Sequence, residues 1–248
     1  MNKKEEIIKK LERGLIVSCQ SKESDPHYSE DITLLMAKAA VWGGAAGLRL
    51  DTPKDIKKIK AECNIPIIGL WKVFSDKSEV FITPGMKYVR ACIEAGADII
   101  AVDATNRLVE GNRYAYEIIN EIKAEFPDLP VLADVRNMED AVIAIENGAD
   151  MVAPTLSRFD KAAKPSSKPD FELLCKLVEV SKDRAKVIME SKINTPEDAM
   201  IALYHGAYSV VVGNAITRPH ITTQKFYDAI NGYKEKRGLY YWEVKKQG

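Results

Sequence analysis

Two residues that can move a proton stand directly after short apolar runs. Lys72 follows Ile67–Trp71, and Glu190 follows Lys186–Met189. A lysine amine serves as a base or a nucleophile near neutral pH only when its pKa is lowered, and burial beside a cation such as Arg49 has that effect. We therefore predict that Lys72 and Glu190 are catalytic. The alternatives are a lysine that extends to solvent and a carboxylate that acts only through its charge.

Polar residues also end most of the other apolar runs. A carboxylate in such a place either contacts a substrate or holds a neighbouring cation. Arg49 could stabilise negative charge that develops on an oxygen, or it could be a structural partner of Asp103. We predict five substrate-binding residues of this kind: Gln20, Arg49, Asp103, Asp134 and Thr155.

The segment after the last apolar run is typical of a phosphate site. Val210–Val212 is followed by Gly213-Asn214 and the start of a short helix, whose backbone N–H groups would face an anion. Arg218 could bind the phosphate through two N–H groups. The alternative is that this turn only caps a helix and that Arg218 is solvated.

The loop after Glu190 would supply the other half of such a site. It contains Asn194 or Thr195 as an N-cap and Pro196 in the first helical turn. The predicted phosphate-binding residues from both loops are Ser191, Lys192, Gly213, Asn214 and Arg218.

A repeated Gly-Ala pair indicates which elements position these residues. The pair occurs four times, at intervals of 52, 52 and 58 residues, and each copy ends a helix-like stretch before an apolar run. A second apolar run lies between successive copies. Continuous apolar runs are typical of parallel strands buried on both faces. The expected strands are Leu15–Cys19, Gly47–Leu50, Pro66–Leu70, Ile99–Asp103, Pro130–Ala133, Met151–Ala153, Lys186–Met189 and Val210–Val212.

Eight strand–helix units in 248 residues predict one (β/α)8 TIM barrel that occupies residues 1–248 as a single α/β domain. In such a barrel the carboxyl ends of the strands meet at one face, so the polar residues described above would share a site. Residues 1–13 are expected to form an amphipathic helix and not a signal peptide.

Composition limits the partners of the chain. Lysine plus arginine and aspartate plus glutamate both number 36, so we expect binding neither to nucleic acid nor to an anionic membrane. No apolar run reaches membrane-spanning length. The four cysteines lack CxxC spacing, which favours a reducing, cytoplasmic compartment. The apolar tail at 239–242 could pack on the barrel or on a second subunit of a homodimer.

Neither a metal nor a nucleotide cofactor is expected. The histidines, His27, His205 and His220, are far apart in the sequence, and none ends a predicted strand. No GxGxxG or P-loop spacing accompanies a strand–helix boundary. Side chains would therefore carry the chemistry.

From Ile16 to Arg218 the chain resembles the N-acetylmannosamine-6-phosphate 2-epimerase family. The segments that carry the resemblance are Leu15–Gln20, Ile82–Pro84, Ala95–Thr105, Asn194–Glu197 and Gly213–Pro219. The resemblance implies interconversion of N-acetylmannosamine 6-phosphate and N-acetylglucosamine 6-phosphate, in sialic acid and amino sugar breakdown, without metal or nucleotide. It also implies that Lys72 moves the C2 proton and that Glu190 assists, with Gln20, Arg49 and Asp134 at substrate-contact positions.

Four residues depart from the family pattern close to the predicted site. Val73 stands where the family usually has arginine, and Ser191 stands where it prefers glycine. Arg158 and Phe159 replace a Gly-Tyr pair after the sixth strand. These changes could narrow the pocket, alter the sugar that it accepts, or mark a paralogue with altered activity.

Two other functions remain open from the sequence. Lys72 could form a Schiff base with a sugar phosphate, as barrel aldolases do. The chain could also be a sugar-phosphate-binding protein without turnover. The set of Lys72, Glu190, Asp134 and Arg49 favours an enzyme, because a binding protein has no need of a tuned base.

Overall fold

Eight parallel strands close into a barrel in the computed structural model of the protein. The structure describes the backbone of residues 2–109, 111–160 and 166–245, with side chains as far as residue 233. β10 pairs with β1, Leu15 beside Val210, and this pairing closes the sheet. The predicted TIM barrel is confirmed. Its strands are β1 (Leu15–Cys19), β2 (Gly47–Asp51), β3 (Ile67–Leu70), β4 (Ile99–Asp103), β7 (Val131–Asp134), β8 (Met151–Ala153), β9 (Lys186–Met189) and β10 (Ser209–Val212).

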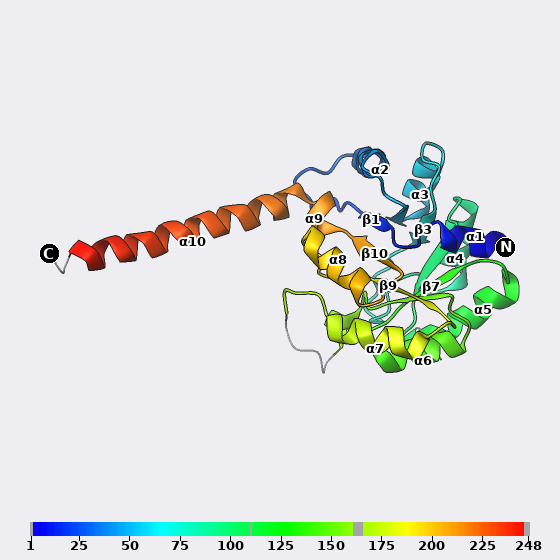
Figure 1. Cartoon of the computed structure of the whole chain (residues 1–248). Helices are drawn as coiled ribbons and strands as arrows, with labels where there is room; N and C mark the ends of the chain where they lie inside the picture. The colour runs from blue at the N-terminus through cyan, green and yellow to red at the C-terminus, as the bar shows by residue number, and fades with distance from the viewer. Residues whose placement is uncertain (1, 110, 161–165, 246–248) are drawn as a thin grey trace.

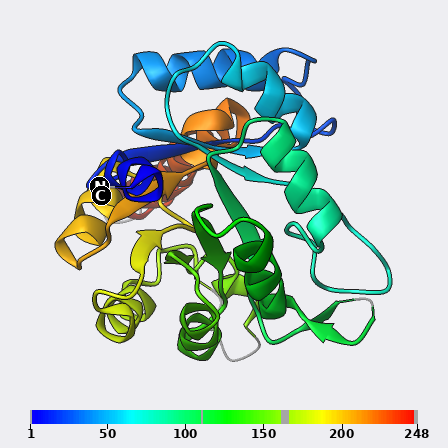
Figure 2. The same cartoon turned by 90° about the vertical axis from the view of Figure 1, so that its right-hand side faces the viewer.

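Helices surround this sheet (Figure 2). The chain also forms a small hairpin of β5 (Leu108–Val109) and β6 (Arg113–Tyr114) after β4, which the sequence did not predict. None of the described helices is both long and apolar enough to cross a membrane. The helices are α1 (Lys3–Lys9), α2 (Ile32–Trp42), α3 (Pro53–Lys60), α4 (Met86–Glu94), α5 (Ile118–Glu125), α6 (Met138–Glu146), α7 (Phe171–Ser181), α8 (Pro196–Tyr204), α9 (Asn214–Thr217) and α10 (Pro219–Lys245).

The repeated glycines end four of the helices that precede barrel strands. Gly44, Gly96, Gly148 and Gly206 have φ values of 92°, 101°, 96° and 92°. Side chains with a Cβ rarely adopt this left-handed conformation, so glycine is favoured at each of these turns. The turn then leads into the next strand with little intervening chain.

Two apolar layers hold the barrel together. One fills the barrel interior, where Ile68, Leu132 and Ile188 pack with Leu11 from the segment after α1. The other lies between the outer faces of the strands and the helices. Because successive strand residues alternate between these layers, Arg49 faces inward while its neighbours Leu48 and Leu50 pack outward.

α10 does not turn back along the barrel as the other helices do. It begins directly after α9 and runs away from the barrel (Figure 1). Four of its apolar side chains, Phe226, Tyr227, Ile230 and Tyr233, are exposed. The side chains of the predicted tail segment, residues 239–242, lie outside the described residues. The direction of α10 carries the backbone of that segment away from its own barrel.

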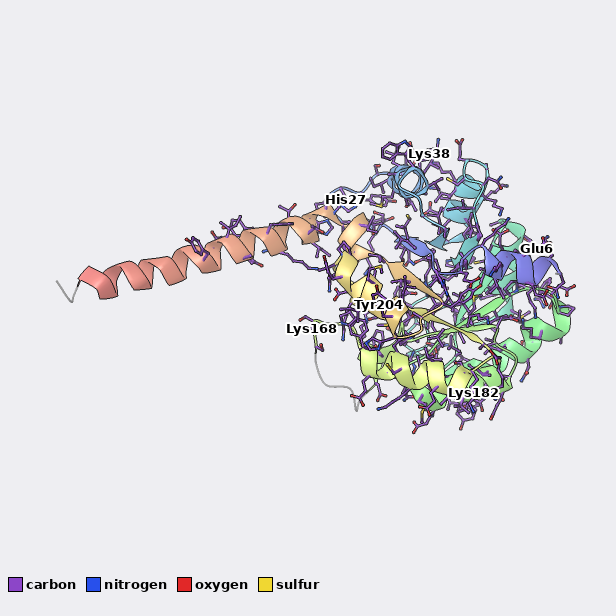
Figure 3. All side chains as sticks on the ribbon, in the orientation of Figure 1. Glu6, His27, Lys38, Lys168, Lys182 and Tyr204 are labelled. Atoms are coloured by element: carbon purple, nitrogen blue, oxygen red, sulfur yellow. The ribbon has the colours of Figure 1, made fainter. Side chains whose placement is uncertain are left out.

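Two contacts join side chains that are far apart in the sequence. His27 lies near the start of α10 (Figure 3), and the centroid of its ring is 5.2 Å from that of His220. Cys175 of α7 is exposed, and its Sγ lies 3.5 Å from Nδ1 of His205. Folding of the chain produces both contacts, which sequence separation conceals.

Candidate active site

A cavity of about 520 Å³ opens at the carboxyl ends of the barrel strands. This volume falls within the range of small-molecule sites. Ten of the twelve predicted site residues line the cavity, while Asp103 and Asp134 lie outside its lining. The ten are Gln20, Arg49, Lys72, Thr155, Glu190, Ser191, Lys192, Gly213, Asn214 and Arg218.

Arg49 lies at the centre of a buried charge cluster. Its Nη1 and Nη2 donate to the two carboxylate oxygens of Asp134 at 3.0 and 2.6 Å. Nη1 also donates to Oε2 of Glu190 at 2.5 Å. The predicted alternative of an Arg49–Asp103 pair is wrong, because Asp134 is the structural partner. This bidentate contact fixes the plane of the guanidinium.

Burial and opposite charge act differently on the members of this cluster. Burial disfavours the charged guanidinium, but Asp134 and Glu190 together raise the pKa of Arg49. Burial also raises the pKa of Glu190, and Arg49 opposes that rise. Glu190 therefore has the environment of an acid that can exchange a proton, whereas Arg49 remains a permanent cation.

Lys72 extends into the same cavity from the residue pair that follows β3. Its side chain is only 25% exposed. Burial lowers the pKa of its amine, Asp51 opposes the change, and Arg49 adds to it. Nζ donates to Oε1 of Gln20, whose own Nε2 donates to Ser18 Oγ at 3.0 Å. The predicted lowering of the Lys72 pKa thus has a structural cause.

Sequence reasoning missed Asp51, which contacts Lys72 in two ways. Oδ1 of Asp51 accepts from the backbone N–H of Lys72 at 2.9 Å, and Oδ2 lies 3.9 Å from Nζ. A signal existed in the sequence. Asp51 follows Arg49 by two residues at the end of the same strand, and the alternation of strand side chains places both toward one face.

The two buried aspartates hold arginines. Asp103 accepts from Arg107 Nη2 at 2.5 Å and from Thr105 Oγ1 at 2.7 Å. Thr155 Oγ1 donates to Asp134 Oδ1 at 2.6 Å, so Asp134 has a second partner besides Arg49. Of the two roles that the sequence leaves open for these carboxylates, the contacts favour positioning of a neighbouring cation.

Cations gather at the other end of the cavity, beside β9, β10 and α9. Lys22, Lys192, Arg218 and Lys225 all line it. Asp25 is a carboxylate beside this group, with its Oδ2 3.5 Å from Nη2 of Arg218. No side chain caps α9 at Gly213. A dianion such as phosphate would therefore meet an excess of positive charge here.

The backbone of the loop after β9 adopts an uncommon conformation. Ser191 has a φ of 95° and Lys192 a φ of 61°. Side chains with a Cβ rarely occupy this region, which explains why glycine is favoured at the position of Ser191 in the family that the chain resembles. The departure at Ser191 therefore places a side chain with a Cβ in a strained backbone conformation.

The N-terminus of α8 is capped by side chains of its own first turn, including the carboxylate of Asp198. Thr195, and not Asn194, is the N-cap, and its side chain accepts from Asp198 N. Asp198 Oδ2 in turn accepts from the backbone N–H groups of Asn194 and Thr195 at 3.0 and 3.1 Å. These donors are thus engaged within the loop, and α9 is the better oriented helix start for an anion.

Arg158 and Phe159 lie at the mouth of the cavity with an aromatic group from the loop after β3. The Phe159 ring packs edge-on against Phe81 at 5.8 Å, and the Arg158 guanidinium lies 4.7 Å from the Phe159 ring centroid. Val73 donates its backbone N–H to Phe81 O at 2.8 Å. The departures at Val73, Arg158 and Phe159 therefore lie at the mouth of the cavity and not in the Arg49 cluster.

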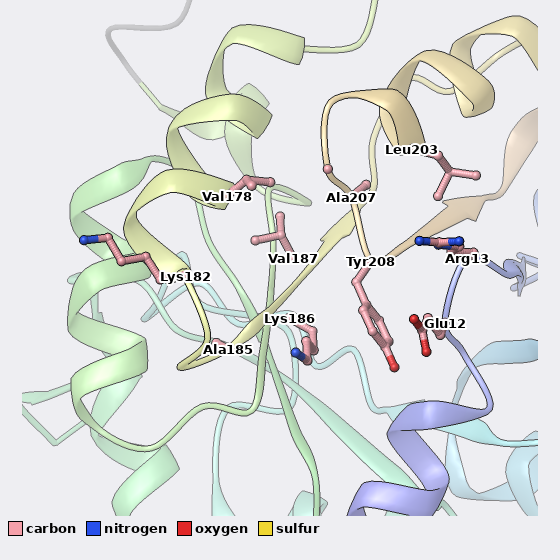
Figure 4. A pocket seen from close by; sticks show the side chains of 11 residues that line it. Glu12, Arg13, Val178, Lys182, Ala185, Lys186, Val187, Leu203, Ala207 and Tyr208 are labelled. Carbon is pink, nitrogen blue, oxygen red and sulfur yellow. The ribbon is translucent and has the colours of Figure 1, made fainter.

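A smaller cavity of about 300 Å³ lies at the opposite end of the strands, between α7 and α8 (Figure 4). Its polar lining consists of Glu12, Arg13, Lys182, Lys186 and Tyr208. It holds none of the predicted site residues. Within the described part of the chain, no group of three or more His, Cys, Asp or Glu side chains is placed to hold a metal ion.

Comparison with solved structures agrees with the barrel fold. The N-acetylmannosamine-6-phosphate 2-epimerase from Clostridium perfringens superposes with a TM-score of 0.84 at 40% identity, over 90% of this chain and 95% of that one. Thiamine phosphate pyrophosphorylase from Pyrococcus furiosus gives a TM-score of 0.55 at 18% identity, over 85% and 89% of the two chains. The second likeness concerns the barrel fold alone.

Sequence comparison covers nearly the whole chain. A family model described as "Putative N-acetylmannosamine-6-phosphate epimerase" matches residues 33–232. Relatives named "Putative N-acetylmannosamine-6-phosphate 2-epimerase" are 44% identical in Caldanaerobacter subterraneus subsp. tengcongensis and 42% identical in Listeria monocytogenes. Both alignments span 94% of this chain, with 96% and 98% of the respective relative. The chain therefore belongs to the N-acetylmannosamine-6-phosphate epimerase family.

Proposed function

We propose that the protein interconverts N-acetylmannosamine 6-phosphate and N-acetylglucosamine 6-phosphate by moving the proton at C2. The observation that carries this proposal is the arrangement of one cavity. A half-buried lysine with a lowered pKa lies at one end, and four cations beside a helix start lie at the other. Membership of the family supports the choice of sugar.

The neutral amine of Lys72 is suited to remove the C2 proton from the open-chain sugar. The electrons of the C2–H bond then form a double bond between C1 and C2, and the aldehyde oxygen becomes an enolate oxygen. The enolate then turns its other face toward Lys72, and the ammonium returns a proton to C2 on that face, which inverts the carbon. Such proton transfer requires a base with a pKa near the working pH.

Arg49 would stabilise the enolate oxygen, with its guanidinium held at the cavity wall by two hydrogen bonds to Asp134. Glu190, also bonded to Arg49, would assist ring opening or proton exchange. Gln20 would orient the Lys72 amine, to which it is hydrogen-bonded. In this arrangement each charged group has a separate role.

The phosphate would anchor the sugar far from the reacting carbon. Lys22, Lys192, Arg218 and Lys225 would share its charge, with the N-terminal N–H groups of α9. Binding energy from this distant group fixes the position of C2 relative to Lys72, which is how remote contacts accelerate a reaction.

Proton NMR of either purified 6-phosphate epimer tests the proposal. The wild-type protein should convert each epimer into the same equilibrium mixture. Lys72→Gln should slow the conversion by roughly 10²–10⁴-fold, the usual contribution of a positioned base. Lys87→Gln, which removes a lysine of α4 that does not line the cavity, is the matched control. Absence of conversion by the wild type contradicts the proposal.

A borohydride experiment separates this reaction from Schiff-base chemistry. Reduction of an imine between substrate and Lys72 would leave a covalent adduct of the sugar mass on that residue. We expect none in the peptide that contains Lys72. A stable adduct there would show an aldolase-type intermediate and contradict direct proton transfer.

We also infer that the protein functions as a homodimer in the cytoplasm. α10 runs away from the barrel and exposes Phe226, Tyr227 and Ile230. The helices on either side of the β10–β1 junction, α8 and α2, expose Tyr204 and Trp42 at 83% and 93%. A second copy could cover both surfaces, since α10 of each copy would pack on the barrel of the other.

A further inference from the structure

Asp51 supports the segment that carries Lys72 without lining the cavity. Its Oδ1 accepts the backbone N–H of Lys72 at 2.9 Å, and its Oδ2 lies 3.9 Å from Nζ. One carboxylate thus contacts both ends of the same residue. The next residue, Thr52, has a φ of 75° and donates its N–H to Leu70 O at 3.0 Å. Such strained backbone is found where a neighbouring group must be held in place.

The opposite side of the Lys72 segment is held by Thr83. The Thr83 Oγ1 accepts from Trp71 N at 3.1 Å and donates to Ala101 O at 2.8 Å. Thr83 N donates to Trp71 O at 2.9 Å. With its backbone held from both sides, Lys72 retains freedom chiefly in its side chain, and the groups around Nζ determine where the amine points.

Charged groups from three elements act on this amine. Asp51 and Arg49 approach from β2, Lys22 from the segment after β1, and Glu190 from the end of β9. Glu190 already accepts a hydrogen bond from Nη1 of Arg49 at 2.5 Å. Asp51 is thus the carboxylate that remains to balance the ammonium form of Lys72.

We propose that Asp51 is a positioning residue that orients the Lys72 amine and sets how readily it holds a proton. The proposal rests on the proposed role of Lys72 as the base. A base that both removes and returns the C2 proton must be stable in its neutral and in its charged form. Asp51 favours the charged form, and burial favours the neutral one.

The test measures the protonation of Lys72 without turnover. Wild type and variants are treated briefly with acetic anhydride across a range of pH, and acetylation of Lys72 is quantified by peptide mass spectrometry. Only the neutral amine reacts, so the midpoint reports the pKa. Asp51→Asn keeps the oxygen that accepts the Lys72 N–H but removes the charge. Asp51→Glu restores the charge. Asp55→Asn removes a carboxylate from α3 that has no contact with Lys72 among the described residues.

Asp51→Asn should lower the midpoint by about one pH unit, as expected for the loss of an opposite charge at this distance. Asp51→Glu should remain closer to the wild type than Asp51→Asn, and Asp55→Asn should match the wild type. The acid limb of the kcat/KM profile should move with the midpoint. A midpoint unchanged in Asp51→Asn, or lowered equally in Asp55→Asn, overturns the proposal.

Acetylation of Lys72 does not require turnover, so it tests the role of Asp51 separately from the proposed function. If the wild type fails to convert either epimer and the midpoint still falls in Asp51→Asn, the assigned reaction is wrong but the action of Asp51 on Lys72 stands. Should Asp51→Asn fail to fold by circular dichroism, Asp51→Ser provides the same comparison, because it keeps an oxygen acceptor and removes the charge.

Discussion

Lys72 should reduce the stability of the fold that it serves. Burial lowers its pKa, so the folded state disfavours its ammonium form relative to the unfolded chain. The destabilisation has its full size at pH values below the pKa of Lys72 in the folded state. It disappears as the pH rises to the pKa of lysine in the unfolded chain, about 10.4. Lys72→Met should therefore raise Tm near pH 7, by roughly 2–4 °C for each kcal/mol relieved.

Calorimetry from pH 6 to 10 tests this sign. The difference in Tm between Lys72→Met and the wild type should shrink as the pH rises, because the wild-type amine becomes neutral. Equal or lower stability of Lys72→Met at pH 7 would show that the contacts of Lys72 with Gln20 and Asp51 outweigh its burial.

Arg218 should contribute to substrate binding and hardly to the chemical step. Loss of a charge-assisted contact with phosphate costs about 1.5–3 kcal/mol, so Arg218→Gln should raise KM by roughly 10–100-fold with a smaller change in kcat. Arg13→Gln is the matched control, because Arg13 lines the smaller cavity at the other end of the barrel. Equal effects of both substitutions on KM contradict the phosphate assignment.

The loop between β9 and α8 contains strain that one substitution should release. Ser191 has a φ of 95°, in a region that glycine adopts easily. Ser191→Gly should raise the free energy of unfolding by roughly 0.5–1 kcal/mol, since the relief exceeds the added entropy of the unfolded chain. Urea unfolding measures this gain. Ser78→Gly, in another loop, should not stabilise, and a loss of stability in Ser191→Gly would contradict the interpretation.

The strands could be predicted from sequence because a parallel strand buried on both faces reads as a continuous apolar run. For the same reason most of the polar residues that end these runs line the cavity at the barrel mouth, although Asp103 and Asp134 do not. The ion pairs between side chains of different strands could not be predicted in this way. Arg49 contacts Asp134 and not Asp103, although both aspartates end barrel strands. The partner of Arg49 depends on which side chains meet across the closed barrel.

The direction of α10 also lay beyond sequence reasoning. A pattern of helical residues after the last strand predicts a helix, but it contains no information on whether the helix turns back. The direction of α10 is set at the connection between α9 and α10, near Arg218 and Pro219. His27 and His220 meet at this same connection, and their contact is equally invisible in sequence separation.

The outward course of α10 has a consequence for the assembly. If α10 packs on a second copy, charges placed among its apolar side chains should separate the copies. Phe226→Lys with Ile230→Lys should shift the mass measured by light scattering from a dimer to a monomer. Gln224→Lys, which adds a charge at a polar position of the same helix, is the control. A wild type that is monomeric at micromolar concentration contradicts the homodimer.

The central claim is that Lys72 exchanges the proton at C2. Incubation of either 6-phosphate epimer in deuterated water, followed by proton NMR of C2, measures this directly. We predict that the wild-type protein introduces deuterium at C2 while the second epimer forms, and that Lys72→Ala does neither while still binding the substrate through the phosphate. Undiminished exchange in Lys72→Ala, or epimer formation by the wild type without any deuterium at C2, would contradict the account.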